Sequence, residues 1–202
     1  MSKKLLTMGC CVLLNWNCAA FAEKETVSNP CSASASLFSL VDRPSKADSP
    51  CTVPMGYVMV ETGYQYLDLI GGVNSQNFPQ SMIRVGLPKN TEIFLFPPNY
   101  NIQTVSPSGG FSAMTVGLKH MFDYTDKWIF SAETLITPTS GSDAFGSGGT
   151  GVTVNGMASY AISNAVGATF MLGASSQTLS ASSGSQRYNS INPDILLSWQ
   201  LS

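Results

Sequence analysis

Residues 56–67 alternate between two kinds of side chain, and this pattern constrains the fold more than any other feature of the sequence. One row of alternate positions is apolar or aromatic apart from one threonine, and the other row is mostly polar. The first row contains Val58, Val60, Thr62, Tyr64 and Tyr66, and the second contains Tyr57, Met59, Glu61, Gly63 and Gln65. Successive side chains of a β-strand point to opposite faces, so the pattern predicts a strand with one apolar face. The segment is long enough to cross a bilayer, which takes about 9–11 tilted residues.

Seven later segments repeat this design. They are residues 79–87, 91–96, 111–122, 127–137, 151–162, 165–177 and 191–201. Three short turns (88–90, 123–126 and 163–164) alternate with four long loops (68–77, 99–110, 138–150 and 178–189). Short turns at one end and long loops at the other are typical of outer-membrane barrels. The sequence therefore predicts an all-β fold, an antiparallel up-and-down transmembrane β-barrel with about eight strands. A soluble β-sandwich, which also alternates, is the competing architecture.

Residues 1–22 have the organisation of a secretory signal peptide. Lys3 and Lys4 supply the positive start, residues 5–14 form an apolar run too short to span a membrane, and residues 20–22 read Ala-Phe-Ala. We therefore expect export and cleavage after Ala22, with the bacterial outer membrane as the destination. A short membrane anchor is the alternative interpretation of the same residues.

The composition excludes some classes of partner. Cleavage would leave eight of the ten basic residues against all twelve acidic ones, a net charge of −4. That balance gives no basic surface for nucleic acid. No run of about 20 apolar residues follows the signal, so we expect the chain to be secreted, periplasmic or a barrel.

Two cysteines, Cys31 and Cys51, remain after the predicted cleavage. In an oxidising compartment an even pair predicts a disulfide. A metal site is the weaker interpretation, because two thiolates and the single His120 do not supply four ligands. We expect residues 23–53 to form a disulfide-closed N-terminal segment, as a plug in the lumen or at the periplasmic mouth, and residues 54–202 to form the barrel domain.

Several ionisable or polar residues lie on strand rows opposite the apolar ones. A charge on the lipid face costs about 2–4 kcal/mol at mid-membrane, so these residues are predicted to face the lumen. The candidates for lining the lumen are Glu61, Gln65, Arg84, Lys119, Glu133 and Asp194. Two roles are open to them: to pair with each other and neutralise the lumen, or to line a permeation path. Glu92 shares its row with two phenylalanines, so its direction is left open.

Nothing in the sequence indicates catalysis. His120 is the only imidazole and lies on an apolar row, and no G-x-S-x-G motif is present. Residues 146–151 match G-x-G-x-x-G by letter, but they precede a strand rather than a helix, so we expect a flexible loop. We predict no enzyme activity, no catalytic residue, no cofactor and no metal.

Several blocks of sequence resemble an outer-membrane family named for the meta-pathway of phenol degradation. The resemblance extends from about Val41 to Ser175. The blocks are residues 41–45 (Val-Asp-Arg-Pro-Ser), 48–56, 60–66, 83–87 with 91–93, and 116–119. The resemblance implies a barrel that moves small hydrophobic compounds, with outer-membrane lipid and the barrel-assembly machinery as partners. Family members continue for further strands, so the resemblance also implies a C-terminally shortened member.

Two functions are therefore carried forward, a channel or transporter for small hydrophobic compounds and a pore-less structural or surface-interaction protein. A shortened, non-functional family member is a variant of the second. Eight strands close around an interior just wide enough for side chains, and the inward rows here are small. We therefore expect residues 56–67 and 191–201 to close poorly or not at all. The oligomeric state stays open.

Overall fold

The computed structural model describes Cys31, Asp42 and residues 47–69 and 72–199. The predicted signal peptide, most of residues 23–46 and the last residues of the predicted eighth strand lie outside this part of the chain. The described residues form two antiparallel β-sheets with one short 3₁₀ helix, η2 (Ala181–Ser183). The prediction of an antiparallel all-β fold is confirmed.

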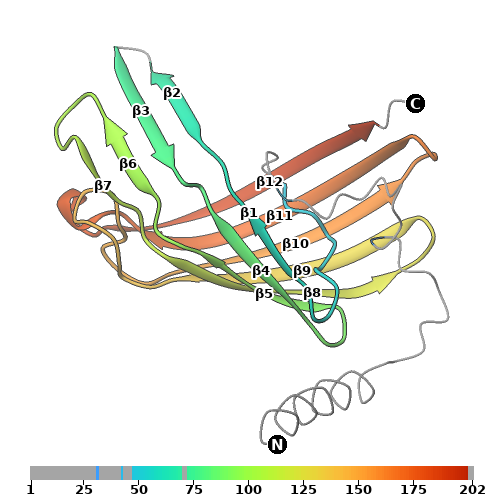
Figure 1. The fold of residues 1–202 in the computed structure, drawn as a ribbon. Coiled ribbons are helices and arrows are strands. Elements are labelled where there is room, and N and C mark those ends of the chain that lie inside the picture. Colours follow the sequence, from blue (N-terminus) through green and yellow to red (C-terminus); the bar gives the residue numbers. More distant parts are fainter. Residues whose placement is uncertain (1–30, 32–41, 43–46, 70–71, 200–202) are drawn as a thin grey trace, which may run out of the picture.

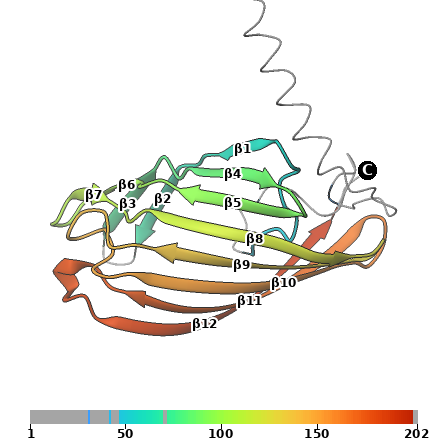
Figure 2. The ribbon, with the colours of Figure 1, turned by 90° about the horizontal axis from the view of Figure 1, so that it is seen from below.

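The larger sheet has eight strands that lie side by side in the order β1-β4-β5-β8-β9-β10-β11-β12. Figures 1 and 2 show that it curves into an open trough. Its strands are β1 (Val58–Glu61), β4 (Met82–Leu87), β5 (Thr91–Phe96), β8 (Thr115–Tyr124), β9 (Trp128–Thr137), β10 (Gly151–Ala161), β11 (Val166–Thr178) and β12 (Arg187–Trp199). The three predicted short turns join β4 to β5, β8 to β9 and β10 to β11.

The smaller sheet continues the first four strands of the large sheet, β1, β4, β5 and β8, beyond a bend. Its order is β2-β3-β6-β7, and its strands are β2 (Gln65–Leu69), β3 (Val73–Phe78), β6 (Tyr100–Gln103) and β7 (Gly109–Phe111). β2 and β3 turn away from the large sheet in Figure 1. Hydrogen bonds continue across the bend, from Gln80 N to Gly63 O at 2.8 Å and from Ser112 N to Asn99 O at 2.9 Å. Prolines 79, 97 and 98 lie at the bend, where a missing backbone donor interrupts the ladder.

Two details of the predicted strand pattern are wrong. The predicted strand 56–67 is broken at residues 62–64 into β1 and β2, and the predicted loops 68–77 and 99–110 contain β3, β6 and β7. The sequence Val-Asn-Ser-Gln-Asn-Phe of β3 is polar on both faces, so alternation gave no signal. Backbone hydrogen bonds form these strands, in antiparallel ladders that run from β2 through β3 and β6 to β7.

The large sheet has two edges, β1 and β12, and no ladder joins them among the described residues. A closed barrel is therefore not observed in the described part of the chain. Within that same part, no helix is long and apolar enough to cross a membrane.

Side chains of opposite character cover the two faces of the large sheet. On the concave face the alternate residues of β4, β5, β8 and β9 are buried, as the burial of Arg84, Glu92, Lys119 and Glu133 illustrates. On the convex face the intervening residues are largely exposed and apolar. This distribution reverses that of a soluble sheet, which buries its apolar face.

Candidate functional site

A row of charged and polar residues on neighbouring strands crosses the concave face, roughly perpendicular to the strands. Strand register places Glu92 opposite Lys119, Lys119 opposite Glu133, and Glu133 opposite Asn155. Directly opposite residues on one face of a sheet contact each other, so opposite charges on β5, β8 and β9 pair along this row. Asn155 Nδ2 donates to Glu133 Oε1 at 2.7 Å, which extends the row to β10.

Arg84, on β4, lies beside this row and binds three carboxylates. Its guanidinium is 3.2 Å from Asp42, 3.2 Å from Glu61 and 2.9 Å from Glu92. Two of its nitrogens, Nε and Nη2, donate to the two oxygens of Glu92 at 3.0 Å each. The side chain is fully buried. A fork-shaped guanidinium matches a carboxylate in this bidentate way, which fixes the geometry of the pair.

Lys119, on β8, is the second cation of the cluster. Its Nζ lies 3.3 Å from Asp42, 3.6 Å from Glu92 and 3.5 Å from Glu133. The ammonium is also 5.9 Å from the centre of the Phe94 ring. Only 1% of the residue is exposed. A buried ammonium is tolerated only when carboxylates and acceptors surround it, as they do here.

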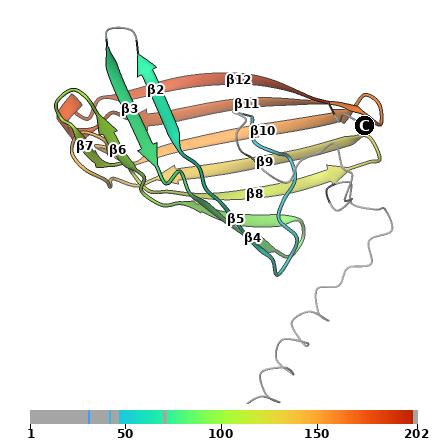
Figure 3. The same ribbon diagram turned by 45° about the horizontal axis from the view of Figure 1, so that its top comes forward.

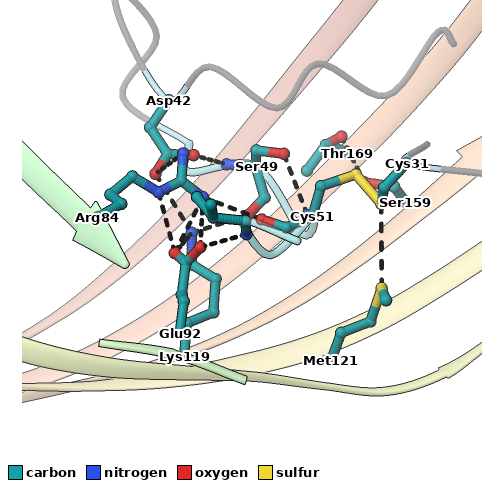
Figure 4. Close-up of a disulfide and its surroundings, with 11 residues drawn as sticks. Cys31, Asp42, Ser49, Cys51, Arg84, Glu92, Lys119, Met121, Ser159 and Thr169 are labelled. Carbon is teal, nitrogen blue, oxygen red and sulfur yellow. Dashed lines mark hydrogen bonds and ion pairs between the residues drawn. A yellow bond between two sulfur atoms is a disulfide. The ribbon is translucent and has the colours of Figure 1, made fainter. Parts of the chain in front are cut away.

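Residues 47–53, hereafter the inner segment, cross the strands along this row on the concave face (Figure 3). Ala47 packs with Met157 and Met171 of β10 and β11. The carbonyl of Ser49 accepts from Lys119 Nζ at 3.0 Å, and at the far end Val53 N donates to Glu92 Oε2 at 2.7 Å. Figure 4 shows Arg84, Glu92 and Lys119 converging on the segment. The charged cluster thus holds the segment as well as itself.

The disulfide between Cys31 and Cys51 is present, as the cysteine pair predicts. Cys51 is fully buried with Met121 and Ile129, and Cys31 packs against the same group. The carbonyl of Cys51 accepts from Arg84 Nη2 at 3.0 Å. The bond therefore holds Cys31 against the floor of the trough, next to the charged cluster.

Two glycines provide space on the concave face. A Cβ at Gly86 would overlap the backbone of Val53 and Pro54, so only glycine lets the inner segment leave the trough beside β4. A Cβ at Gly117 would overlap the ring of Phe94, its partner on β5. Phe94 and Glu92 therefore both point into the trough, which answers the open question about the direction of Glu92.

The cluster consists of ion pairs and of hydrogen bonds to the backbone of the inner segment. His120 is separate from it, with Nδ1 2.8 Å from the Thr91 hydroxyl. Among the described residues, no group of three or more histidine, cysteine, aspartate or glutamate side chains is placed to hold a metal ion.

Four of the six residues predicted to line a lumen meet in this cluster: Glu61, Arg84, Lys119 and Glu133. Gln65 lies instead on β2 of the smaller sheet, exposed, and accepts from Gln80 at 3.3 Å. Asp194 is half-buried on β12 at the opposite edge. The sequence did not predict Asp42 and Asp48 as members of the cluster. Both precede the first strand, so no alternation of side chains indicates which way they point.

The convex face carries large apolar side chains on every strand of the large sheet from β5 to β12. They are Ile93, Val116, Leu118, Phe122, Trp128, Phe130, Ile136, Val152, Val154, Phe170, Leu172, Ile195, Leu197 and Trp199. Trp128 stacks on Phe130 with ring centres 5.6 Å apart and lies 4.4 Å from Tyr160. These rings and Trp199, which pairs with Val166, lie at the end of the sheet with the short turns.

The chain was compared with family models, with curated proteins and with solved structures, and none of the three comparisons found a match.

Proposed function

We propose that this protein is an outer-membrane β-barrel protein and acts as a channel or transporter for small hydrophobic compounds. The observation that carries the proposal is the reversed distribution of side chains, with charges buried on the concave face and apolar side chains exposed on the convex face. A contiguous apolar surface over six neighbouring strands of the large sheet marks contact with a membrane or a large partner. Strands of 10 and 11 residues, such as β8, β9 and β10, match the length needed to cross a bilayer.

Three further features support the same proposal. The aromatic residues Trp128, Tyr160 and Trp199 gather at the short-turn end, as in the aromatic girdles of outer-membrane barrels. The disulfide fits an oxidising compartment. The resemblance of the sequence to a family of hydrophobic-compound transporters suggests the class of solute.

The second candidate is a pore-less outer-membrane protein with a structural or surface-interaction role. The inner segment favours it, because this segment and its ion pairs occupy the concave face from β4 to β11. In this case Arg84 and Lys119 neutralise an interior without lining a path.

Permeation through vesicles distinguishes the two. The full-length chain would be expressed with its own N-terminus in a Gram-negative host, recovered from the outer-membrane fraction and reconstituted into lipid vesicles. A channel accelerates entry of a small aromatic solute over empty vesicles, and a pore-less protein leaves entry unchanged. Recovery of the protein only from the soluble fraction would contradict both.

A further inference from the structure

The large sheet ends in two edge strands, β1 and β12, and within the described part of the chain neither has a strand on its outer side. Figure 2 shows them at opposite edges of the trough. On the convex face Val60 of β1 is 65% exposed and Leu197 of β12 is 71% exposed, against 50% for Leu118 in the middle of the sheet. If the sheet lies in lipid, as the proposed function has it, each edge needs a partner strand, because lipid cannot satisfy backbone N–H and C=O groups.

The direction of the strands decides which edge can meet which. Every ladder of the large sheet is antiparallel, so β1 and β12, the first and eighth strands in its order, run in opposite directions. Two copies of the chain inserted with the same orientation can therefore pair β12 of one copy with β1 of the other in an antiparallel ladder. Pairing β12 with β12, or β1 with β1, would give parallel ladders, which are less stable and occur nowhere else in this sheet.

Two acidic residues restrict the register of such a ladder. Glu61 of β1 lies opposite Met82, and Asp194 of β12 lies opposite Met171, and both methionines are buried on the concave face. The two acids therefore point to the same side of the sheet. Like charges placed directly opposite each other destabilise a strand pair. The register that sets Glu61 against Asp194 is therefore disfavoured.

A shift by two residues avoids this contact and aligns the irregular parts of both edges. It sets Val60 opposite Leu197, and the break at residues 62–64 between β1 and β2 then lies opposite residues 193–195. Pro193 has no backbone N–H to donate, so the missing donor falls where the other edge has no regular strand. The opposite shift would set Pro193 against Val60, inside β1.

We propose that two copies of this chain close one barrel, in which β12 of each copy pairs with β1 of the other and Val60 lies opposite Leu197 of the other copy. Eight strands from each copy give about 16. Barrels of that size leave an aqueous channel, whereas side chains fill an eight-stranded interior. Each copy then forms half of the lumen wall, and the lumen is incomplete without the second copy. This inference rests on the proposed function and adds the partner that the channel requires.

Disulfide cross-linking between differently tagged copies tests the pairing. Val60→Cys in one copy and Leu197→Cys in the other would be expressed together in a Gram-negative host and oxidised in the outer-membrane fraction. Cys31 and Cys51 are already bonded to each other. We expect a cross-linked dimer that carries both tags on a non-reducing gel. Ile195→Cys, two residues away on the same face, is the matched control for Leu197→Cys and should cross-link much less. Stronger cross-linking with Ile195→Cys would overturn the proposed register.

Two other patterns of cross-linking would also contradict the proposal. A dimer formed by Leu197→Cys alone would show that β12 pairs with β12. A double variant that cross-links within one chain, while the mixed single variants do not, would show a monomer that closes on itself.

The unmodified protein gives a test that does not depend on any variant. Native mass spectrometry in detergent should give twice the mass of one mature chain, and the mass of a single chain would overturn the dimer. Permeation of the aromatic solute, measured on the same preparation, separates this inference from the proposed function. A monomer that admits the solute refutes the dimer and retains the channel, whereas a dimer that admits none supports the pairing and refutes the channel.

Discussion

The two faces of the large sheet, formed by the same strands, carry opposite kinds of side chain. On the concave face, Arg84 and Lys119 are buried at 0% and 1% exposure and are surrounded by carboxylates and backbone carbonyls. On the convex face, one residue further along the same strand, Leu118 is 50% exposed. A soluble protein places these two kinds of residue the other way round. On the proposed function, the convex face contacts lipid and the concave face forms a polar interior.

The concave face is itself divided. From β4 to β9 it holds the charged cluster and the disulfide, and the inner segment crosses it from β4 to β11. From β10 to β12 its residues are mostly neutral, such as Ser159, Thr169 and Met171, and the one charged residue described there is Asp194. Ser49 and Val53 of the inner segment bind the charged part, whereas Ala47 packs on the neutral part against Met157 and Met171.

The largest expected effect is at Arg84. Arg84→Met leaves Asp42, Glu61 and Glu92 without their shared cation in a buried site, and breaking such a network costs about 3–5 kcal/mol. The free energy of unfolding in detergent, from a urea or guanidinium titration, measures this loss. Arg187→Met is the control, because Arg187 is an exposed cation and its loss should cost about 0.5 kcal/mol. Equal effects of the two variants would show that the cluster is not buried as described.

A charge placed on either face of β8 sharpens the comparison. Leu118→Arg puts a cation on the convex face and should cost about 2–4 kcal/mol of membrane insertion. Thr115→Arg puts it on the concave face, where the lost hydrogen bond to Thr137 costs about 1 kcal/mol. Insertion into vesicles, scored by resistance to added protease, separates them. If Leu118→Arg is as mild as Thr115→Arg, the convex face lies in water.

The smallest expected effect lies in the neutral half of the trough. The hydroxyls of Ser159 and Thr169 bond at 2.6 Å and are almost completely buried. Ser159→Ala leaves the Thr169 hydroxyl without this partner and should cost about 1 kcal/mol. Adding Thr169→Val should cost less than the two single changes together, and simple additivity would mean that the hydroxyls do not interact.

Alternation predicted the strands of the large sheet well. Residues 91–96 match β5 to the residue, and the rows predicted for β8, β9 and β10 are the ones that the burial pattern gives. In a strand with one buried face, the side chains alternate strictly between the two faces. This alternation also predicted that Glu61, Arg84, Lys119 and Glu133 share the inner face.

The sequence did not predict the features that depend on contacts between distant segments. The polar strands β3, β6 and β7 have no apolar face to reveal them. Asp42 and Asp48 precede the first strand, and their places follow from the disulfide and from Lys119, 77 residues after Asp42 along the chain. The inward direction of Glu92 depends on the gap that Gly117 leaves for Phe94, which no local pattern reports.

The tryptophans test the central claim, that the convex face lies against lipid, most directly. Trp128 is 42% exposed and Trp199 is 74% exposed on that face, and the third tryptophan, Trp16, lies in the predicted signal peptide. Mature protein in vesicles would be titrated with phospholipid brominated near the headgroup and, separately, with aqueous iodide. We expect strong quenching by the brominated lipid and little by iodide. Strong quenching by iodide with none by the brominated lipid would contradict a membrane-embedded sheet.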